Sequence, residues 1–205
     1  MTRRDTQVHL DQQGLEGWTP MHDVWRTVVE GVTGSMAYIA DRNWKLKACN
    51  AEFEALFPGG RAPSNIMRWM LLDEQARQHT LTDWSEYWAP AACPALRQAV
   101  TDRPADPELI DMATDVRLDP VVGPIYLATE SSNAVHPDGA VRPIRHPVKG
   151  PGWLITSAAN PLTEIDARVV IMQFKPGTTR PHQPSPLSRE NMWQPQAPAW
   201  TADKP

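Results

Sequence analysis

The spacing of apolar residues changes twice along the chain, and this change limits the folds that the sequence can adopt. At 36–48 and again at 141–174, apolar and polar residues tend to alternate with a period of two, as in half-exposed strands. At 20–32 and through much of 50–130, apolar residues recur at steps of three and four, which predicts helices. The order of one helix, two strands, a helical block and three strands predicts an α+β domain with an antiparallel sheet.

Polar side chains and prolines predict where the helices begin. Asn50 can cap a helix after the first hairpin, and Asp106 and Asp119, each followed by proline, predict two more starts. Asp83, three residues before a glutamate, resembles a capping box. Thr19, also followed by proline, predicts the start of the first helix.

Three further prolines interrupt the predicted elements. Pro90 and Pro94 predict that the helix after Asp83 bends or is split. Pro143 cannot donate a backbone hydrogen bond, so the strand that contains it is expected at an edge of the sheet or to be irregular.

Composition divides the chain into a domain with two tails. The polar, glutamine-rich residues 1–18 and the proline-rich residues 176–205 are predicted to be disordered. Residues 19–175 are predicted to form one domain, since a chain of 205 residues with 41% apolar content can bury one substantial core.

Charge and apolar run length argue against nucleic-acid and membrane partners. The net charge is −4 and no cluster of Lys and Arg occurs, so direct DNA binding is not expected. The apolar runs, such as "VVIM" at 169–172, are too short to span a bilayer, and the N-terminus lacks an apolar signal segment. We therefore expect a cytoplasmic protein.

The sequence contains none of the common catalytic signatures. No GxSxG, GxxxxGK[ST], GxGxxG or HExxH motif occurs, and the six histidines are scattered, so we predict no catalytic residue, no metal and no cofactor. Cys49 and Cys93 show no CxxC spacing and are expected to pack in the core. An enzyme that uses Cys49 or His146 as its reactive group remains an alternative.

Tryptophan is unusually frequent, with nine Trp against three Tyr and three Phe. Three of them, Trp69, Trp84 and Trp88, fall within residues 65–88. The acidic balance makes stacking on bases the least favoured use, which leaves core packing or the wall of an apolar pocket. Ile66, Trp69 and Met70 stand at helical spacing and predict one apolar face.

Five short blocks follow one another at compatible spacing over about residues 35–175. They include the strings "AYIADRNWKLKACNAEF", "NIMRWMLLDEQARQHTLTDWSEY", "LRQAVTDRPADPELIDM" and "HPVKGPGWLITSAANPL". This order resembles the ligand-binding domain of MmyB-like transcription regulators. The positions that carry the resemblance are Asn50, Asn65 with Arg68 and Trp69, Arg77 with Trp84, Asp106 to Leu109, and His146-Pro147 with Gly150.

The resemblance implies a PAS-like fold, in which an antiparallel sheet is cupped by helices around an apolar cavity for a fatty or aromatic effector. In the family a helix-turn-helix normally precedes this domain, and about 35 residues before the hairpin are expected to be too few for one. A homodimer or a separate DNA-binding regulator is therefore the expected protein partner. Val122 and Tyr126 stand where the family favours Phe and Trp, which implies a reshaped cavity.

We therefore predict a non-enzymatic domain that senses a small apolar, fatty-acid-like molecule. The residues expected to line its pocket are Tyr38, Phe53, Phe57, Ile66, Trp69, Met70, Trp88, Tyr126 and Ile171. Arg68 could pair with a ligand carboxylate or face solvent. Two alternatives remain, namely a biosynthetic enzyme that reuses the cavity and a ligand-free dimerisation module.

Overall fold

A computed structural model describes residues 21–129, 139–162 and 166–182. In these residues five strands form one antiparallel sheet of order β2-β1-β5-β4-β3. The strands are β1 Met36–Asp41, β2 Leu46–Cys49, β3 Ala140–His146, β4 Gly150–Ala159 and β5 Ala167–Pro176. The predictions for residues 1–18, Thr19 and 183–205 lie outside the described residues.

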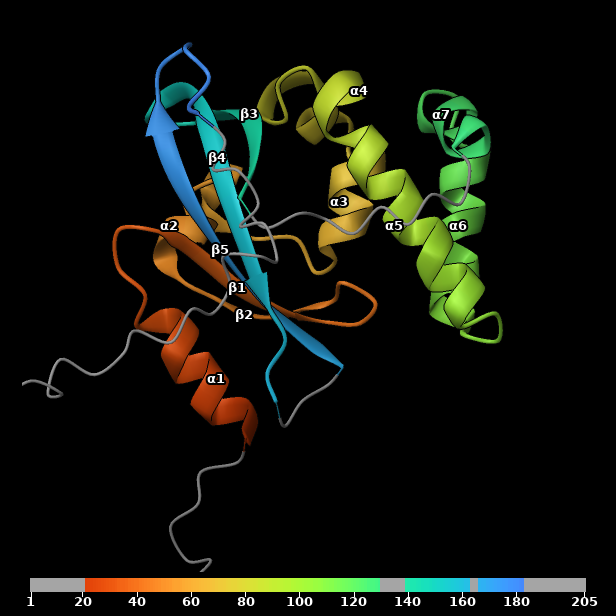
Figure 1. Cartoon of the computed structure of the whole chain (residues 1–205), viewed down its shortest axis with the longest axis horizontal. Helices are drawn as coiled ribbons and strands as arrows, with labels where there is room; N and C mark the ends of the chain where they lie inside the picture. The colour runs from red at the N-terminus through yellow and green to blue at the C-terminus, as the bar shows by residue number, and fades with distance from the viewer. Residues whose placement is uncertain (1–20, 130–138, 163–165, 183–205) are drawn as a thin grey trace, which may run out of the picture.

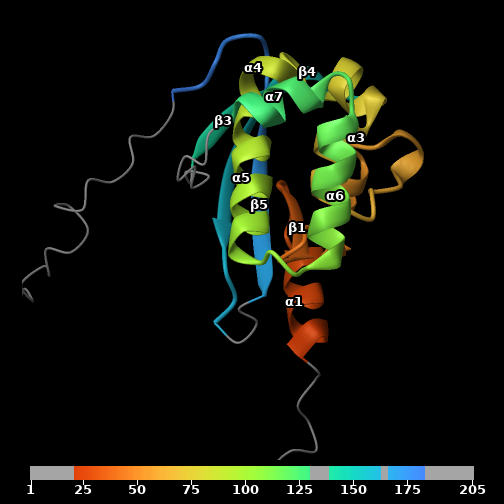
Figure 2. The ribbon, with the colours of Figure 1, turned by 90° about the vertical axis from the view of Figure 1, so that its right-hand side faces the viewer.

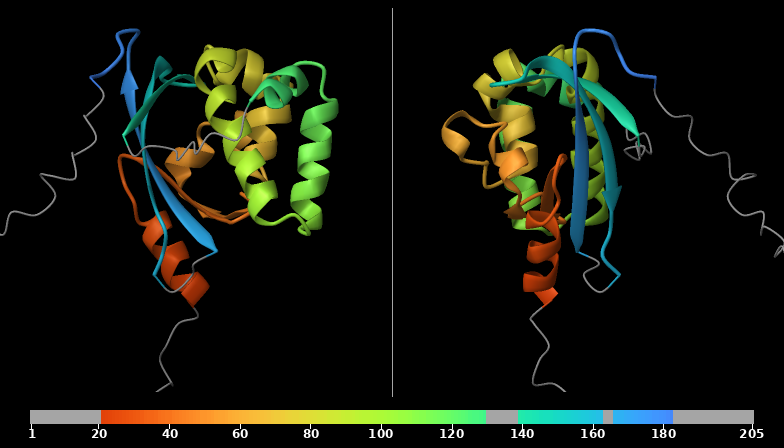
Figure 3. Two further views of the ribbon diagram at one scale, coloured as in Figure 1. Left: turned by 45° about the vertical axis from the view of Figure 1, so that its right-hand side comes forward. Right: turned by 90° about the vertical axis from the view of Figure 1, so that its left-hand side faces the viewer.

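The helices lie mainly on one face of the sheet, and this confirms the predicted α+β class with a sheet cupped by helices (Figure 1). They are α1 Met21–Glu30, α2 Ala51–Glu54, α3 Ile66–Leu72, α4 Trp84–Tyr87, α5 Ala89–Asp102, α6 Pro107–Leu118 and α7 Val122–Ala128. A π-helical turn, η3 Ala76–Thr80, precedes α4. Figure 2 looks onto this helical layer, and Figure 3 shows that α1 lies apart from it.

The two faces of the sheet contact different cores because successive side chains of a strand point to opposite sides. Met36 and Met172, which pair between β1 and β5, belong to the main core under the helices. Ala37, Ile39 and Val169 belong to a smaller core that packs against α1. The main core therefore lies between the sheet and the helical layer.

Three of the predicted helix starts are confirmed by side-chain caps. The Asn50 side chain accepts the N–H of Phe53 at 3.0 Å. The Asp106 carboxylate accepts from the first turn of α6. The Asp119 carboxylate accepts from Val121 and Val122, both at 2.8 Å, at the start of α7. A short polar side chain, followed by proline at Asp106 and Asp119, was sufficient to locate these starts.

The predicted capping box at Asp83 is wrong. Asp83 has a φ of 49°, in the left-handed region, and its side chain caps no helical N–H. A capping residue needs an extended backbone, whereas Asp83, in the short connection between η3 and α4, has a left-handed one. As the prolines predicted, the helix is split, since α4 ends at Tyr87 and α5 begins at Ala89. Pro94, by contrast, lies inside a continuous α5.

Both outer strands have backbone groups that are already engaged. The strand β3 lies at one edge of the sheet, as Pro143 predicted, and the Pro143 carbonyl accepts the Trp88 indole N–H at 2.9 Å. Beside β2, at the other edge, the chain just before α3 pairs with the hairpin: Leu46 donates to Ser64, and Ile66 donates to Trp44, each at 2.9 Å.

Candidate ligand site

Four of the predicted pocket residues form one aromatic row. The ring centroids of Tyr38 and Phe53 are 4.8 Å apart, those of Phe53 and Phe57 are 5.0 Å apart, and those of Phe57 and Trp69 are 5.0 Å apart. We call these four residues the aromatic row. It runs from β1 through α2 to α3, and Tyr38 and Trp69 at its two ends are only partly buried. Burial raises the pKa of Tyr38 to about 12, against a smaller lowering by Arg168, so the phenol stays neutral.

The helix α3 contributes more to the core than the sequence predicted. Ile66 is buried and Met70 is partly buried, as are the residues around them. Met67 and Leu71, which were not predicted, are 2% and 0% exposed. Almost every residue of "IMRWMLL" is apolar, so the spacing fits two apolar stripes, one through Ile66 and Met70 and one through Met67 and Leu71. Periodicity alone therefore could not show which stripe is the more deeply buried.

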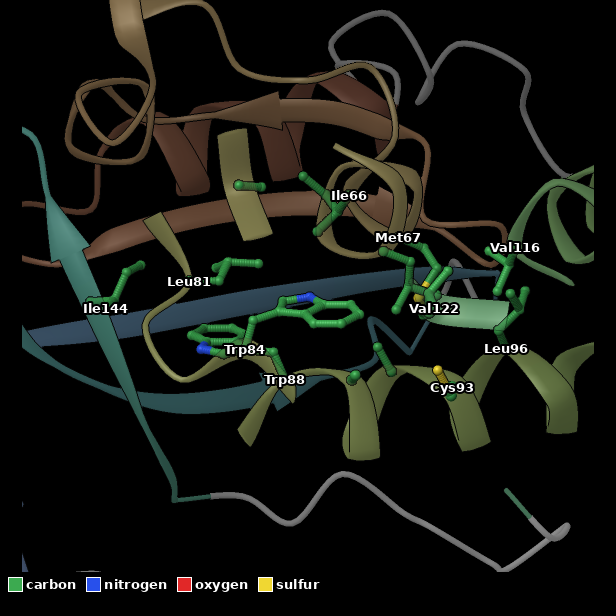
Figure 4. Close-up of a cluster of buried hydrophobic side chains, with 14 of the residues drawn as sticks. Ile66, Met67, Leu81, Trp84, Trp88, Cys93, Leu96, Val116, Val122 and Ile144 are labelled. Atoms are coloured by element: carbon green, nitrogen blue, oxygen red, sulfur yellow. The ribbon is translucent and has the colours of Figure 1, made fainter. Parts of the chain in front are cut away.

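Trp88 and Tyr126 belong to the same core but have other partners. The guanidinium carbon of Arg142 lies 5.7 Å from the centroid of Trp88, and that of Arg97 lies 5.6 Å from Tyr126. Figure 4 shows Trp88 near Trp84, among apolar side chains of the helices and of β3. Eight of the nine predicted pocket residues, all except Ile171, thus share one cluster, and Trp88 and Tyr126 lie in it outside the aromatic row.

Two predicted residues point elsewhere. Ile171 is 38% exposed and lies on the opposite face of the sheet from Val170 and Met172, which corrects its predicted inward orientation. The run "VVIM" contains no polar residue, so it could not indicate which face was buried. Arg68, expected either to pair with a ligand carboxylate or to face solvent, forms an exposed ion pair with Asp115 of α6.

A surface hollow of about 470 Å³ opens between η3, α4 and α7. We call it the α4 hollow, and its lining residues are Glu74, Arg77, Gln78, Asp83, Trp84, Ser85, Val121 and Ile125. Trp84 is 6% exposed, so its side chain belongs to the main core as well as to the hollow. Its indole N–H donates to the Met70 carbonyl at 2.8 Å, which joins the hollow to α3.

Arg77 holds the polar side of the α4 hollow in place. Its Nη1 lies 2.9 Å from Asp119 Oδ1 and donates to the Leu71 carbonyl at 3.2 Å, while its guanidinium carbon lies 5.7 Å from the Trp84 centroid. Desolvation is the largest single effect on Asp119 and raises its pKa. The hydrogen bonds from Arg77 and from two backbone N–H groups together outweigh it, so the pKa of Asp119 is lowered below 3.8. The Arg77 charge is therefore neutralised within the wall.

The asparagines of the blocks "ACNAEF" and "NIMRWM" act as structural connectors. The Asn50 side chain bonds four backbone groups in three segments. Asn65 caps α3 by accepting the Arg68 N–H at 3.0 Å, and it donates to the Asn43 carbonyl at 2.8 Å. Both residues tie helices to the β1–β2 hairpin, so their contacts are with the backbone and not with an open site.

His146 likewise shapes a turn. It is 2% exposed, and its Nδ1 accepts the N–H groups of Val148 and Lys149 at 3.1 and 3.3 Å in the β3–β4 connection. Burial, and then the charge of Lys149, lower the pKa of His146 below 6.5. Gly150, with a φ of 75°, completes the turn. The neutral ring is thus an acceptor for the turn.

Cys49 and His146 are not placed to act together as a catalytic pair. Cys49 ends β2 and His146 ends β3, which are the two opposite edges of the sheet. Four strand spacings place them roughly 19 Å apart, too far for one to activate the other. Within the described segments, no three His, Cys, Asp or Glu residues are grouped to hold a metal, and no helix is long and apolar enough to cross a membrane.

We expect Cys49 to react slowly with thiol reagents. Burial, followed by the charges of Glu54 and Glu30, raises the pKa of Cys49 to about 11, so its thiolate fraction at pH 8 should be roughly 100-fold below that of an ordinary thiol. The rate of reaction with Ellman's reagent should fall accordingly, and the variant Cys49→Ala should lose only this slow phase. Native labelling as fast as that of free glutathione would contradict this prediction, and faster labelling would show an activated thiol.

The comparisons with known proteins support a regulatory domain. The family model described as "MmyB-like transcription regulator ligand binding domain" matches residues 21–183 of the chain. No curated protein matches the sequence at a significant level. The matched range covers every described helix and strand, from α1 to β5.

Proposed function

Because the chain belongs to the family of MmyB-like transcription regulator ligand-binding domains, we propose that it senses a small apolar molecule and signals through protein contacts. The family is a class of regulator domain and not of enzyme. The observation that carries the proposal is the family match over residues 21–183, and the α4 hollow, of about 470 Å³, is the proposed entrance for the ligand.

The connection of the hollow with the main core supports an apolar ligand. Trp84 lines the hollow and packs in the core, and its bond to the Met70 carbonyl makes α3 the next element inward. We propose that the ligand enters over Trp84 and separates the side chains of α3 from those of α4. Methionine adapts its shape and tryptophan supplies a flat apolar wall, so this interior suits an acyl chain or a fused ring.

A medium-chain fatty acid is the proposed test ligand. Each buried methylene contributes roughly 0.8 kcal/mol, so a chain of ten carbons could bind at micromolar concentration after the costs of association. The proposed cellular setting is the cytoplasm, with a second copy of the chain or a separate DNA-binding regulator as the partner. Val24 and Val28 on α1, 42% and 48% exposed, are apolar groups that such a contact could cover.

Filling the α4 hollow should block ligand binding without unfolding the domain. Ser85 lines the hollow and is exposed, so Ser85→Trp should weaken decanoic acid binding about tenfold or more in calorimetric titrations. Its neighbour Glu86 is also exposed but does not line the hollow, so Glu86→Trp is the matched control. Equal binding by both variants would show that the ligand does not use this entrance.

A further inference from the structure

The described chain continues beyond β5 and returns to the domain surface. The Gly177 N–H donates to the Pro151 carbonyl at 3.0 Å, and its φ of 113° allows the chain to turn where other residues would be strained. Figure 1 shows this turn in blue beyond the end of β5. The chain then brings Arg180 back to Trp153, the residue of β4 that pairs with Lys175.

Arg180 lies against two aromatic rings at once. Its guanidinium carbon is 5.6 Å from the centroid of Tyr87, at the end of α4, and 5.9 Å from that of Trp153. The two rings are 6.2 Å apart with an interplanar angle of 85°. We call this pair of rings the aromatic slot. Faces of Tyr and Trp attract cations, and a planar, weakly hydrated guanidinium stacks on them better than an ammonium does.

Both walls of the aromatic slot are held by rigid elements. The Tyr87 carbonyl accepts Nε of Arg142 at 3.0 Å, and the next residue, Trp88, donates to the Pro143 carbonyl. Trp153 lies in β4, which is flanked by β3 and β5, and it pairs with Pro143 of β3 and with Lys175 of β5. The slot is thus fixed by the sheet, while the residues from 177 to 182 reach it as an irregular segment.

We propose that Tyr87 and Trp153 form a binding site for a guanidinium group on a peptide, and that this site is occupied in cis by Arg180. The site lies outside the α4 hollow and does not depend on a ligand there. Arg180 remains exposed to water, and two exposed cation–π contacts favour the docked state by only about tenfold. The segment is therefore docked for most of the time yet is easily displaced by an arginine from another chain.

The first test removes the internal occupant. In the full chain, Arg180→Ala should move the NMR signal of the Trp153 indole N–H, assigned by its loss in Trp153→Phe, because the cation leaves the ring. Arg26→Ala, which removes an exposed arginine from α1, is the control and should leave this signal in place. An unchanged Trp153 signal in Arg180→Ala would overturn the proposal.

The second test refills the vacated slot from outside. A blocked peptide with the sequence of residues 177–182, GTTRPH, should shift the Trp153 signal of Arg180→Ala saturably and return it toward the parent position. The parent protein should bind this peptide about tenfold more weakly, since its slot is already occupied. The peptide GTTAPH should have no effect. Equal binding by the parent and Arg180→Ala, or equal binding of the two peptides, would refute a guanidinium site.

Discussion

Replacing Asn50 by alanine should destabilise the domain by on the order of 4 kcal/mol, a large part of the total stability of an ordinary domain. The Asn50 side chain is 2% exposed and makes four hydrogen bonds of 2.8–3.0 Å. Its oxygen accepts from Ala37 and Phe53, and its nitrogen donates to Val32 and Ser35. The variant would leave these backbone groups without their partner where water has little access.

Urea denaturation followed by circular dichroism would measure this loss. Asn65→Ala is the matched control because Asn65 is also a helix cap on the same hairpin, but it is half-buried and makes two such bonds. It should cost about 1–2 kcal/mol. If the two variants lost the same free energy of unfolding, the four hydrogen bonds of Asn50 would stabilise the domain no more than the two of Asn65, and the prediction would be wrong.

Replacing Trp69 by alanine should weaken decanoic acid binding at least tenfold while the domain stays folded. Trp69 is the partly exposed end of the aromatic row, in edge contact with Phe57, and it neighbours Met70, whose carbonyl holds Trp84. We propose that a ligand entering over Trp84 reaches the Trp69 ring. A tenfold loss of affinity on removal of this flat apolar wall corresponds to about 1.4 kcal/mol.

Trp25→Ala provides the comparison for this experiment. Trp25 is a partly buried residue of α1 that packs against the smaller core, on the opposite face of the sheet. Its removal should lower the melting temperature and leave the affinity for decanoic acid unchanged. Should both variants bind as the parent does, or should no apolar ligand bind the parent, the sensing function would be wrong and the main core would be a filled one.

The parts of the fold that depend on neighbouring residues could be predicted from the sequence. The strands within residues 141–174 were expected from a change in residue spacing, and each cap at Asn50, Asp106 and Asp119 needs only a short polar side chain before a helix. Pro143 indicated an edge strand for an equally local reason, the missing N–H.

The features that depend on distant contacts could not be predicted. The register between β5 and β1 determines that Val170, and not Ile171, faces the helices. A continuous apolar run contains no polar residue that would indicate this register. The left-handed backbone of Asp83 lies in the connection between η3 and α4, and no neighbouring residue indicates it. The α4 hollow and the aromatic slot combine residues from separate elements, and Arg180 fell within a segment whose composition predicted disorder.

The engaged strands at both margins of the sheet restrict how copies of this chain could assemble. An unpaired margin invites another strand to add to it, which is a common route to domain swapping and to fibrils. Here Pro143 offers no donor and its carbonyl is bonded to Trp88, while the backbone of Trp44 and Leu46 is paired with the segment before α3. Extension of the sheet across molecules is therefore disfavoured at these points, which favours a dimer that joins through side-chain surfaces such as the outer side of α1.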